Sequence, residues 1–319
     1  MNRYIKHCCV IGGGGFIGHK VVQALLGTGR QVSVIGRSQT PRAPLPHGVS
    51  YLCGDIGDRV FLTGALHGVQ EIIDLAYAST PKTSYENPVA DIISNLPPVV
   101  SLFQVASEIP LDKFVVVSSG GVVYGKSDRL PINEDHPTNP MSPYGITKLA
   151  AEKYALMYWR TSSLPVVCVR PGNAYGEGQV PFSGQGFIAT AITSILQGRE
   201  ILLYGTTGAV RDYIHVEDIA MGIVAALERG TPGSCYNIGT GIGHNNKEVL
   251  DILTRYSQKS GKEPLIRVMP SRPFDVPENV LDSTKLLMAT GWRAQIGFEE
   301  GIDLVWKWFV EKEAKAVLL

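Results

Sequence analysis

Short apolar runs alternate along the first half of the chain with longer segments in which apolar residues recur at helical spacing. The runs expected to form buried strands are residues 7–11, 31–35, 49–52, 71–76, 113–118 and 165–169. The segments expected to form helices between them include residues 16–26, 89–108 and 144–160. Strands that alternate with helices in this way predict an α/β fold built on a doubly wound parallel sheet.

After Arg170 this alternation gives way to a different pattern. Residues 172–186 are rich in glycine and proline, which is typical of a long functional loop. Beyond it we expect helices at residues 187–197, 246–260 and 298–312, and a short strand at 200–204. The chain has no internal repeat and no flexible linker, so these elements predict a smaller C-terminal lobe interwoven with the first.

Composition excludes several classes of protein. Lys plus Arg and Asp plus Glu both number 29, so the formal net charge is zero and a nucleic-acid partner is not expected. The five cysteines are scattered without the spacing of a zinc site, so we predict no metal centre. A signal peptide is not evident, and no apolar run approaches the ~20 residues of a membrane helix. We therefore expect a cytoplasmic protein with no membrane partner.

A glycine-rich turn separates the first predicted strand from the first predicted helix. Gly12, Gly15 and Gly18 have G-x-x-G-x-x-G spacing, which permits a tight turn and close approach of the backbone to a pyrophosphate. The free N–H groups at the start of the helix then face the anion. The sequence therefore predicts a dinucleotide site at this edge of the sheet. Its candidate contacts are Gly12, Gly15, Phe16, Ile17, Gly18, Leu75 and Ala76.

The second strand lacks the acid that usually binds the adenosine ribose of NAD. It is followed by Gly36, Arg37 and Ser38, with no carboxylate. Arg37 could accept the 2′-phosphate of NADP, so we predict NAD as the cofactor with NADP as the alternative; Arg37 could also stack on adenine or be solvated. Asp55 and Ile56 follow the third strand and are placed to meet the adenine edge, although Asp55 could equally be a helix cap.

Tyr144 and Lys148 form a Y-x-x-x-K pair at the start of a predicted helix. Their i, i+4 spacing puts both side chains on one face, where the ammonium is expected to lower the pKa of the phenol from about 10. Tyr144 is thus a candidate general base toward a hydroxyl group. A solvated surface pair is the alternative. Ser118 and Ser119, which end the fifth strand, add hydroxyls at the same edge.

Together these motifs resemble the extended short-chain dehydrogenase/reductase family, and within it the UDP-glucose 4-epimerase-like sugar-nucleotide enzymes. The matching segments are residues 12–18, 118–125, 144–148, 170–176, 211–218 and 272–275. The resemblance implies a Rossmann domain of residues 1–172 plus about 213–240, and a substrate lobe of residues 173–212 and 241–319. It also implies that Tyr144 is the catalytic base, that Lys148 holds the nicotinamide ribose, and that Asn173 binds the substrate diphosphate.

The resemblance assigns further substrate contacts to the second lobe. Arg211 and Arg272 resemble the pair that clamps the diphosphate, and guanidinium groups suit phosphate oxygens. Asp275 resembles the acid that binds the nucleotide ribose. From the residues alone, Arg211 could instead form a structural ion pair with Asp212 or Asp218.

Three neighbouring positions depart from patterns found in the family. The family's catalytic serine or threonine falls on Gly120, and the acid pair of the dehydratases falls on Gly121 and Val122. The absence of carboxylates there argues against 4,6-dehydration. Ser119 or Ser118 is expected to replace the missing hydroxyl.

Asn279 falls where the epimerases carry a residue that limits the size of the sugar. Its intermediate size makes N-acetylhexosamines acceptable and does not exclude plain hexoses. We therefore predict an NDP-sugar 4-epimerase that acts through a transient 4-keto sugar. A 4-ketoreductase that consumes NADPH is the alternative, and a non-catalytic dinucleotide sensor is a third. Relatives often pair through two helices of the first lobe, so we expect a homodimer built on residues 96–108 and the Tyr144 helix.

Overall fold

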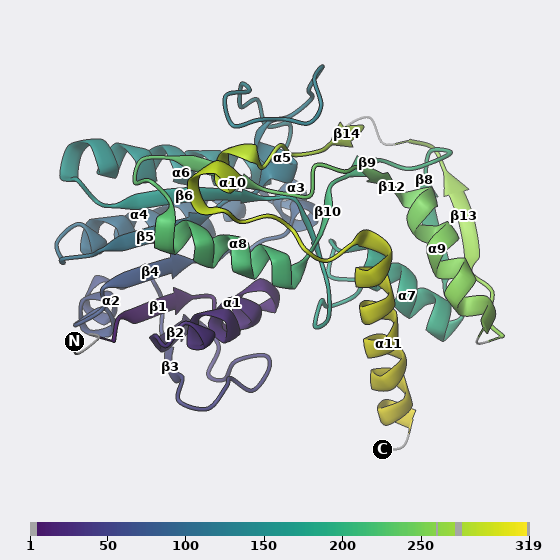
Figure 1. Cartoon of the computed structure of the whole chain (residues 1–319), viewed down its shortest axis with the longest axis horizontal. Coiled ribbons are helices and arrows are strands. Elements are labelled where there is room, and N and C mark those ends of the chain that lie inside the picture. The colour runs from purple at the N-terminus through teal and green to yellow at the C-terminus, as the bar shows by residue number, and fades with distance from the viewer. Residues whose placement is uncertain (1–4, 260, 272–275, 318–319) are drawn as a thin grey trace.

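The computed structural model describes residues 5–259, 261–271 and 276–317, and its centre is a seven-stranded parallel sheet (Figure 1). The strand order is β11-β6-β5-β4-β1-β2-β3. The strands are β1 (His7–Ile11), β2 (Gln31–Gly36), β3 (Ser50–Cys53), β4 (Glu71–Asp74), β5 (Lys113–Val117), β6 (Val166–Pro171) and β11 (Cys235–Ile238). The predicted doubly wound α/β fold is confirmed. Because β1 lies between β2 and β4, the chain reverses direction across the sheet there, and ligands bind at such a switch point.

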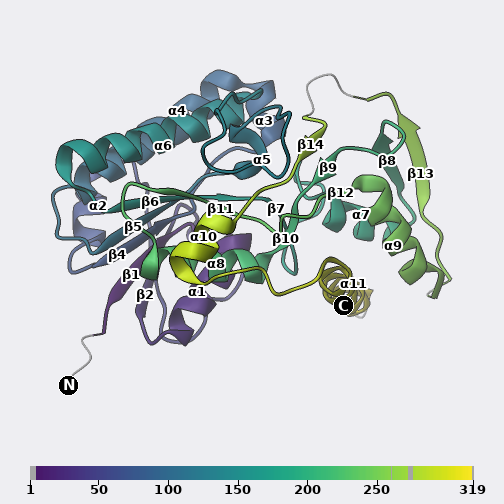
Figure 2. The ribbon, with the colours of Figure 1, turned by 45° about the horizontal axis from the view of Figure 1, so that its top comes forward.

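Helices cover both faces of the sheet, as Figure 2 shows. One face carries α1 (Phe16–Gly27), α8 (Val216–Arg229) and α10 (Thr284–Thr290), and the other carries α2 (Arg59–Ala65), α4 (Pro88–Ala106) and α6 (Pro143–Ser162). Each layer has its own apolar core. Val21 and Ile223 pack under the first layer, and Leu102, Phe103 and Ala155 under the second.

A smaller lobe follows the carboxyl ends of the strands. It contains α7 (Phe187–Gln197), β8 (Glu200–Tyr204), α9 (Asn246–Lys259), β13 (Leu265–Met269) and α11 (Phe298–Val317). Its core includes Ile192, Leu203, Leu250 and Trp306. The lobe boundaries near residues 172, 213 and 240 stay a prediction. The chain does return between them to the sheet through α8 and β11.

Short strands connect the lobe to the sheet. They are β7 (Asn173–Tyr175), β9 (Val210–Arg211), β10 (Tyr213–His215), β12 (His244–Asn245) and β14 (Glu278–Asn279). β7 pairs with β10, and β9 lies between β12 and β14. The remaining short helices, α3 (Pro81–Glu86) and α5 (Gly120–Val123), lie at the carboxyl ends of β4 and β5.

Within the described residues, α4 alone is long and apolar enough to cross a membrane by length and composition. Its apolar face packs on the sheet through Leu102 and Phe103. Asp91 and Asn95 interrupt its apolar sequence, and both are buried in polar contacts with the chain after β4. This packing accounts for the buried apolar residues of α4, whereas others, such as Val89 and Ile93, are exposed.

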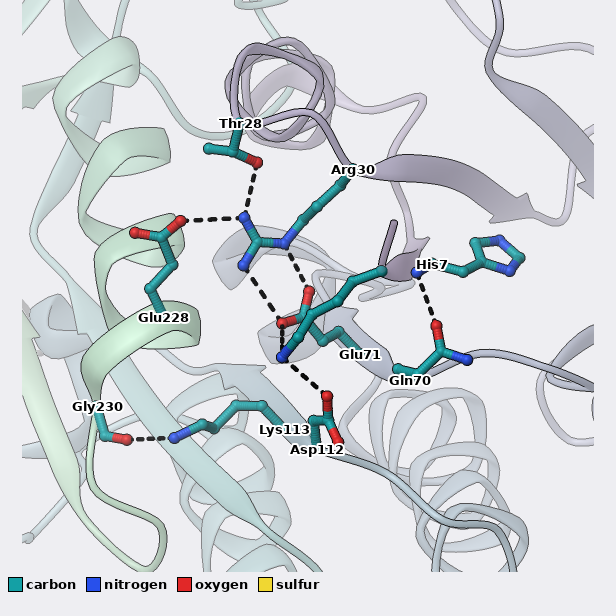
Figure 3. A network of polar contacts seen from close by, with 10 residues as sticks. His7, Thr28, Arg30, Gln70, Glu71, Asp112, Lys113, Glu228 and Gly230 are labelled. Carbon is teal, nitrogen blue, oxygen red and sulfur yellow. Dashed lines mark hydrogen bonds and ion pairs between the residues drawn. The ribbon is translucent and has the colours of Figure 1, made fainter. Parts of the chain in front are cut away.

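An ion-pair network fastens the amino ends of the central strands (Figure 3). Arg30, just before β2, donates from Nε to Glu71 Oε2 at 2.6 Å and from Nη1 to Glu228 of α8 at 3.0 Å. Lys6 bridges Glu71 at 3.3 Å and Asp112 at 2.8 Å. The Glu71 side chain is only 2% exposed, so it depends on these cations for its charge. The network holds β2, β4 and α8 together at the edge opposite the candidate site.

We expect Arg30→Ala to lower the free energy of unfolding by roughly 3 kcal/mol, because it leaves the buried Glu71 carboxylate short of its main partner. Arg59→Ala is the matched control: Arg59 pairs with Glu108 at 2.7 Å, but both side chains are more than half exposed. That variant should lose much less stability, because solvent screens an exposed ion pair. Urea denaturation followed by circular dichroism measures both. Equal losses in the two variants would contradict the role given to the buried network.

Candidate active site

The glycine turn after β1 has the geometry of an anion site. Gly12 has φ +78°, which favours glycine, and a Cβ there would lie 3.1 Å from the backbone nitrogen of Ala76. A Cβ at Gly18 would overlap the carbonyl oxygen of Gly12, so α1 begins in direct contact with the turn. The N–H groups of Phe16, Ile17 and Gly18 occupy the first turn, where a helix supplies no acceptor. These donors are available to a pyrophosphate.

A cavity of 780 Å³ extends from this turn along the carboxyl ends of the strands into the second lobe. Its volume is that of a small-molecule site. Its wall includes Gly12 at one end, Tyr144 and Lys148 in the middle, and Asn173 and Arg211 at the other end. The structure therefore brings together predicted cofactor, catalytic and substrate residues from separate parts of the sequence.

Helix α6 presents its polar residues to the cavity in a fixed orientation. Ser142 caps the helix by accepting from the Gly145 N–H at 3.1 Å. Lys148 is followed one turn later by Glu152, which is 1% exposed. Glu152 pairs with the buried Arg170 of β6 at 2.7 Å. This pair locks the rotation of α6 against the sheet and so sets where Tyr144 and Lys148 point.

Lys148 lies between two aromatic rings and the end of β5. Its ammonium donates to the carbonyl oxygen of Val117 at 3.0 Å and lies 4.2 Å from the ring centroid of Tyr77. The ring centroid of Tyr144 is 6.0 Å away. Burial lowers the pKa of Lys148 to about 8, against the opposing charge of Asp74. The solvated surface pair considered from the sequence is therefore wrong.

The sequence predicted that Lys148 lowers the pKa of the Tyr144 phenol, but in the chain alone that pKa is raised. Burial, and then the charge of Asp91, raises the pKa of Tyr144 above its usual value. The Lys148 ammonium does not offset that desolvation in the chain alone. Tyr144 therefore holds its proton at neutral pH until a further positive charge is placed beside it.

Both serines at the end of β5 border the cavity. The Ser118 hydroxyl is buried and has no hydrogen-bond partner among the described residues. It also borders a second cavity of about 20 Å³ behind Lys148 and Asp74, which has room for one water molecule. Ser119 precedes α5 without capping it, so its hydroxyl is not used by the helix.

Gly120 faces the protein interior. A Cβ there would lie 2.5 Å from Leu281 and 2.9 Å from the carbonyl oxygen of Arg170, so the second lobe fills the space of a side chain. Gly121 is the neighbour that borders the cavity, and its Cβ would lie 3.2 Å from Asn173 Oδ1 and 3.9 Å from Ser119 Oγ. Ser119 and Asn173 thus both lie beside Gly121 at the cavity wall.

At the adenine end of the predicted cofactor site, Tyr51 explains the missing acid. A Cβ at Gly36 would overlap the Tyr51 phenol, which donates to the Ser38 carbonyl oxygen at 2.6 Å. Arg37 is exposed and does not border the cavity, whereas Arg42 does. The sequence argument missed Arg42 because nothing local marks the loop that folds back over the glycine turn.

Asp55 is not a helix cap. Its carboxylate accepts from the Gly57 N–H at 2.7 Å, and α2 is capped by Asp58. Ile56 packs against the sheet core. On the neighbouring strand, Leu75 borders the large cavity, and Ala76 donates to Asp74 at 3.0 Å and borders the small one.

At the substrate end, Asn173 on β7 and Arg211 on β9 both border the cavity. Arg211 donates to the Val210 carbonyl oxygen at 2.8 Å. The two acids considered as its structural partners are bound elsewhere. Asp212 accepts from Thr240, Gly241 and Leu281, and Asp218 accepts from Gln295 and Ile296.

Three predicted substrate residues are not found at the cavity wall, two of them because they are not described. Arg272 and Asp275 lie outside the described residues. Asn279 is 1% exposed, and its amide donates to the Gly120 carbonyl oxygen at 3.0 Å. It does not border the cavity, so the inference of sugar size from Asn279 is not supported.

A buried polar cluster beside the site escaped the sequence argument. Asp91 of α4 accepts from Thr147 of α6 at 2.7 Å, from Asn95 and from Ser79. Tyr77 joins the cluster and contacts both Lys148 and Tyr144. Tyr77 follows the predicted contacts Leu75 and Ala76 directly, which is the signal that could have found it. In the parts of the chain described, no group of His, Cys, Asp and Glu could hold a metal ion.

Comparison with known proteins places the chain among nucleotide-sugar enzymes. A UDP-glucose 4-epimerase of Mycolicibacterium smegmatis is 32% identical over 311 residues, covering 95% of this chain and 98% of that protein. The crystal structure of the Thermus thermophilus UDP-glucose 4-epimerase in complex with NAD has a TM-score of 0.88 at 34% identity, with coverage of 95% and 99%. The dTDP-glucose 4,6-dehydratase DesIV of Streptomyces venezuelae, with NAD bound, has 0.87 at 29%, with coverage of 97% and 98%.

Similarity to both an epimerase and a dehydratase identifies the family but does not distinguish between the two reactions. The sequence profile of the NAD dependent epimerase/dehydratase family matches residues 8–239, which is most of the chain. The whole-chain similarity extends beyond that match into the second lobe. This chain is an enzyme of the NAD dependent epimerase/dehydratase family.

Proposed function

We propose that this enzyme is an NDP-sugar 4-epimerase, with a UDP-hexose or UDP-N-acetylhexosamine as its substrate and a transient 4-keto sugar as its intermediate. The observation that carries the proposal is the continuity of the cavity. One space joins the glycine turn, the Tyr144 and Lys148 pair, and the Asn173 and Arg211 end. A cofactor and a sugar nucleotide can therefore meet beside the Tyr144 phenol.

The residues at the first end of the cavity fit NAD. The α1 amides of Phe16 and Ile17 are placed to receive the pyrophosphate, and Gly12 leaves room for close approach. The partnerless Ser118 hydroxyl and the Lys148 ammonium border the place expected for the nicotinamide half. When bound, oxidised NAD supplies a hydride acceptor that returns the hydride to the same carbon, together with a positive charge near the phenol.

The chain's own residues supply the proton chemistry and the grip on the substrate. Tyr144 first gives its own proton to solvent. Its phenolate oxygen then takes the proton of the sugar C4 hydroxyl, and it gives that proton back to the C4 oxygen after the 4-keto sugar has rotated. Lys148 stabilises the phenolate, and Ser119 donates a hydrogen bond to the C4 oxygen. Asn173 and Arg211 hold the diphosphate, with Arg272 and Asp275 proposed as further contacts, so that the sugar itself stays free to rotate.

The side chains at the cavity wall also bear on two alternative reactions, dehydration and reduction of a 4-keto sugar. Dehydration needs an acid to expel the C6 hydroxyl, and neither Gly121 nor Val122 at the cavity wall provides one. A 4-ketoreductase that consumes NADPH stays the second candidate. The observation in its favour is Arg42, a cation at the cavity wall beside the glycine turn, in a site with no acid at Gly36.

We also propose a cytoplasmic homodimer paired through α4 and α6. On α4, Val89 and Ile93 are 65% and 63% exposed, and on α6, Tyr154 and Met157 are 40% and 37% exposed. Such a strip of exposed apolar residues on two neighbouring helices suits a self-complementary interface. The buried free thiols, such as Cys168, suit a reducing compartment.

The epimerase proposal is tested by adding UDP-galactose or UDP-N-acetylgalactosamine to the purified protein without cofactor. We expect conversion to the C4 epimer, measured by chromatography, while the amount of bound NAD stays constant. Tyr144→Phe keeps the ring contact with Tyr77 and should lose about 10²- to 10⁴-fold in kcat, because the proton acceptor is gone. Full activity in this variant would remove Tyr144 from the mechanism. Stoichiometric oxidation of added NADPH by a 4-keto sugar nucleotide, without epimerisation, would favour the ketoreductase.

Two single variants test whether Ser119 supplies the hydroxyl that the family's serine or threonine would provide at Gly120. We expect Ser119→Ala to lower kcat about 100-fold with little change in KM, because the hydrogen bond to the C4 oxygen matters most as charge develops there. Ser118→Ala is the matched control and should retain most of the activity. A loss confined to Ser118→Ala would transfer the role to that residue. Unchanged turnover in both variants would exclude a serine hydroxyl from the reaction.

The oligomeric state is measured by size-exclusion chromatography with light scattering. We expect the parent protein to elute as a dimer and the Ile93→Glu variant as a monomer, because the new carboxylate would be buried in the interface without a partner. Val268→Glu changes an equally exposed residue of β13 in the second lobe and should stay dimeric. A monomeric parent protein, or a dimeric Ile93→Glu variant, would contradict the proposed interface.

A further inference from the structure

Tyr77 occupies a position between the two central residues of the site. It follows β4 and borders both the large cavity and the small one. Its ring lies 4.2 Å from the Lys148 ammonium, measured to the ring centroid. It also meets the Tyr144 ring edge to face, with centroids 4.7 Å apart and planes at 66°. One side chain thus contacts both members of the Y-x-x-x-K pair.

The ammonium of Lys148 has few other partners in the described structure. One N–H is directed at the Val117 carbonyl oxygen. The face of the Tyr77 ring covers another side, and an aromatic face attracts a cation most strongly where water is excluded. Lys148 is only 7% exposed, so the ring replaces solvent that the ammonium has lost.

Tyr77 is itself held in place. Its hydroxyl lies 3.4 Å from Asp91 Oδ1 and 3.4 Å from the Tyr144 carbonyl oxygen. Asp91 is 2% exposed, and its other oxygen accepts from Thr147 Oγ1 at 2.7 Å. Thr147 directly precedes Lys148 on α6, so Asp91 holds both the Tyr77 ring and the segment that carries Lys148 in fixed positions.

We propose that Tyr77 is a positioning residue whose ring keeps the Lys148 ammonium charged and in place beside Tyr144. The inference deepens the proposed epimerase function and rests on it, because the charge matters there for stabilising the Tyr144 phenolate. Tyr77 acts through Lys148 and takes no part in proton transfer.

The charged state of Lys148 depends on the groups that face it from each element packed around it. Asp74 of β4, Glu152 of α6 and Asp91 of α4 favour the charged lysine, and burial opposes them. The remaining titratable neighbours are the phenols of Tyr77 and Tyr144. The balance leaves the pKa of Lys148 at about 8, close enough to neutrality for a lost contact to change its charge under assay conditions. Removing the ring lowers this pKa further, so the ammonium is lost at a lower pH.

The pH profile of kcat with UDP-galactose tests the inference. We expect the alkaline limb of Tyr77→Leu to move down by about half a pH unit or more relative to the parent enzyme. The loss of activity should therefore be larger at pH 8.5 than at pH 6.5. Tyr77→Phe keeps the ring face and should keep the limb in place. Tyr77→Met repeats the test with a second apolar side chain, and thermal unfolding checks that each variant is folded.

An activity-independent readout separates the inference from the proposed function. NMR titration of protein labelled with ¹³C at the lysine ε carbon, with Lys148→Met to assign the signal, gives the pKa of Lys148 directly. We expect it to fall in Tyr77→Leu and to stay in Tyr77→Phe. A value that stays or rises in Tyr77→Leu, or falls equally in both variants, would overturn the role of the ring. Parent enzyme without turnover of any UDP-hexose would refute the epimerase while the titration still decides on Tyr77.

Discussion

The ion pair between Glu152 and Arg170 is the contact on which the geometry of the site depends. Both side chains are at most 5% exposed, and the guanidinium also donates to the Tyr124 hydroxyl at 2.9 Å. Glu152 lies one turn beyond Lys148 on α6. Arg170 lies near the end of β6, and the chain continues from there into β7, which begins with Asn173. This buried interaction therefore ties the helix that carries Tyr144 and Lys148 to the strand that leads to Asn173. A charge that is taken out of water needs its partner, so neither side chain can move away alone.

Burial acts in opposite directions on the two central residues and makes the site dependent on what binds there. It raises the pKa of Tyr144 and lowers that of Lys148, so both are driven toward their neutral forms. A site of this kind is a poor base by itself. A positive charge placed beside the phenol would favour the phenolate and make Tyr144 a stronger base. Tyr77 and the acids around Lys148 work against the effect of burial by keeping that side chain charged.

Local sequence patterns predicted the elements that build the sheet, because a buried parallel strand needs a continuous apolar run. The predicted strand at 7–11 and helix at 187–197 match β1 and α7, and the glycine turn and the α6 pair meet at the cavity as expected. The sequence analysis did not assign α8, although apolar residues such as Ile219 and Ile223 recur in it at helical spacing. Arg42, Tyr77 and Asp91 were missed for a different reason. Their roles depend on contacts between distant segments, which no spacing along the chain encodes.

Gly120, where the family's serine or threonine is missing, and Asn279, the predicted sugar-size position, are parts of one structural feature. The segment from Asn279 to Leu281 passes directly behind α5. Asn279 donates to the Gly120 carbonyl oxygen, and Leu281 fills the space that a side chain at Gly120 would need. A serine at Gly120 would have to displace Leu281, which is fully buried and also bridges to Ile132. The packing of the second lobe thus requires glycine there, and it leaves the hydroxyl function to a neighbour that borders the cavity. Ser119 meets that condition, so the missing family serine is a consequence of how the lobes pack and does not by itself argue against catalysis.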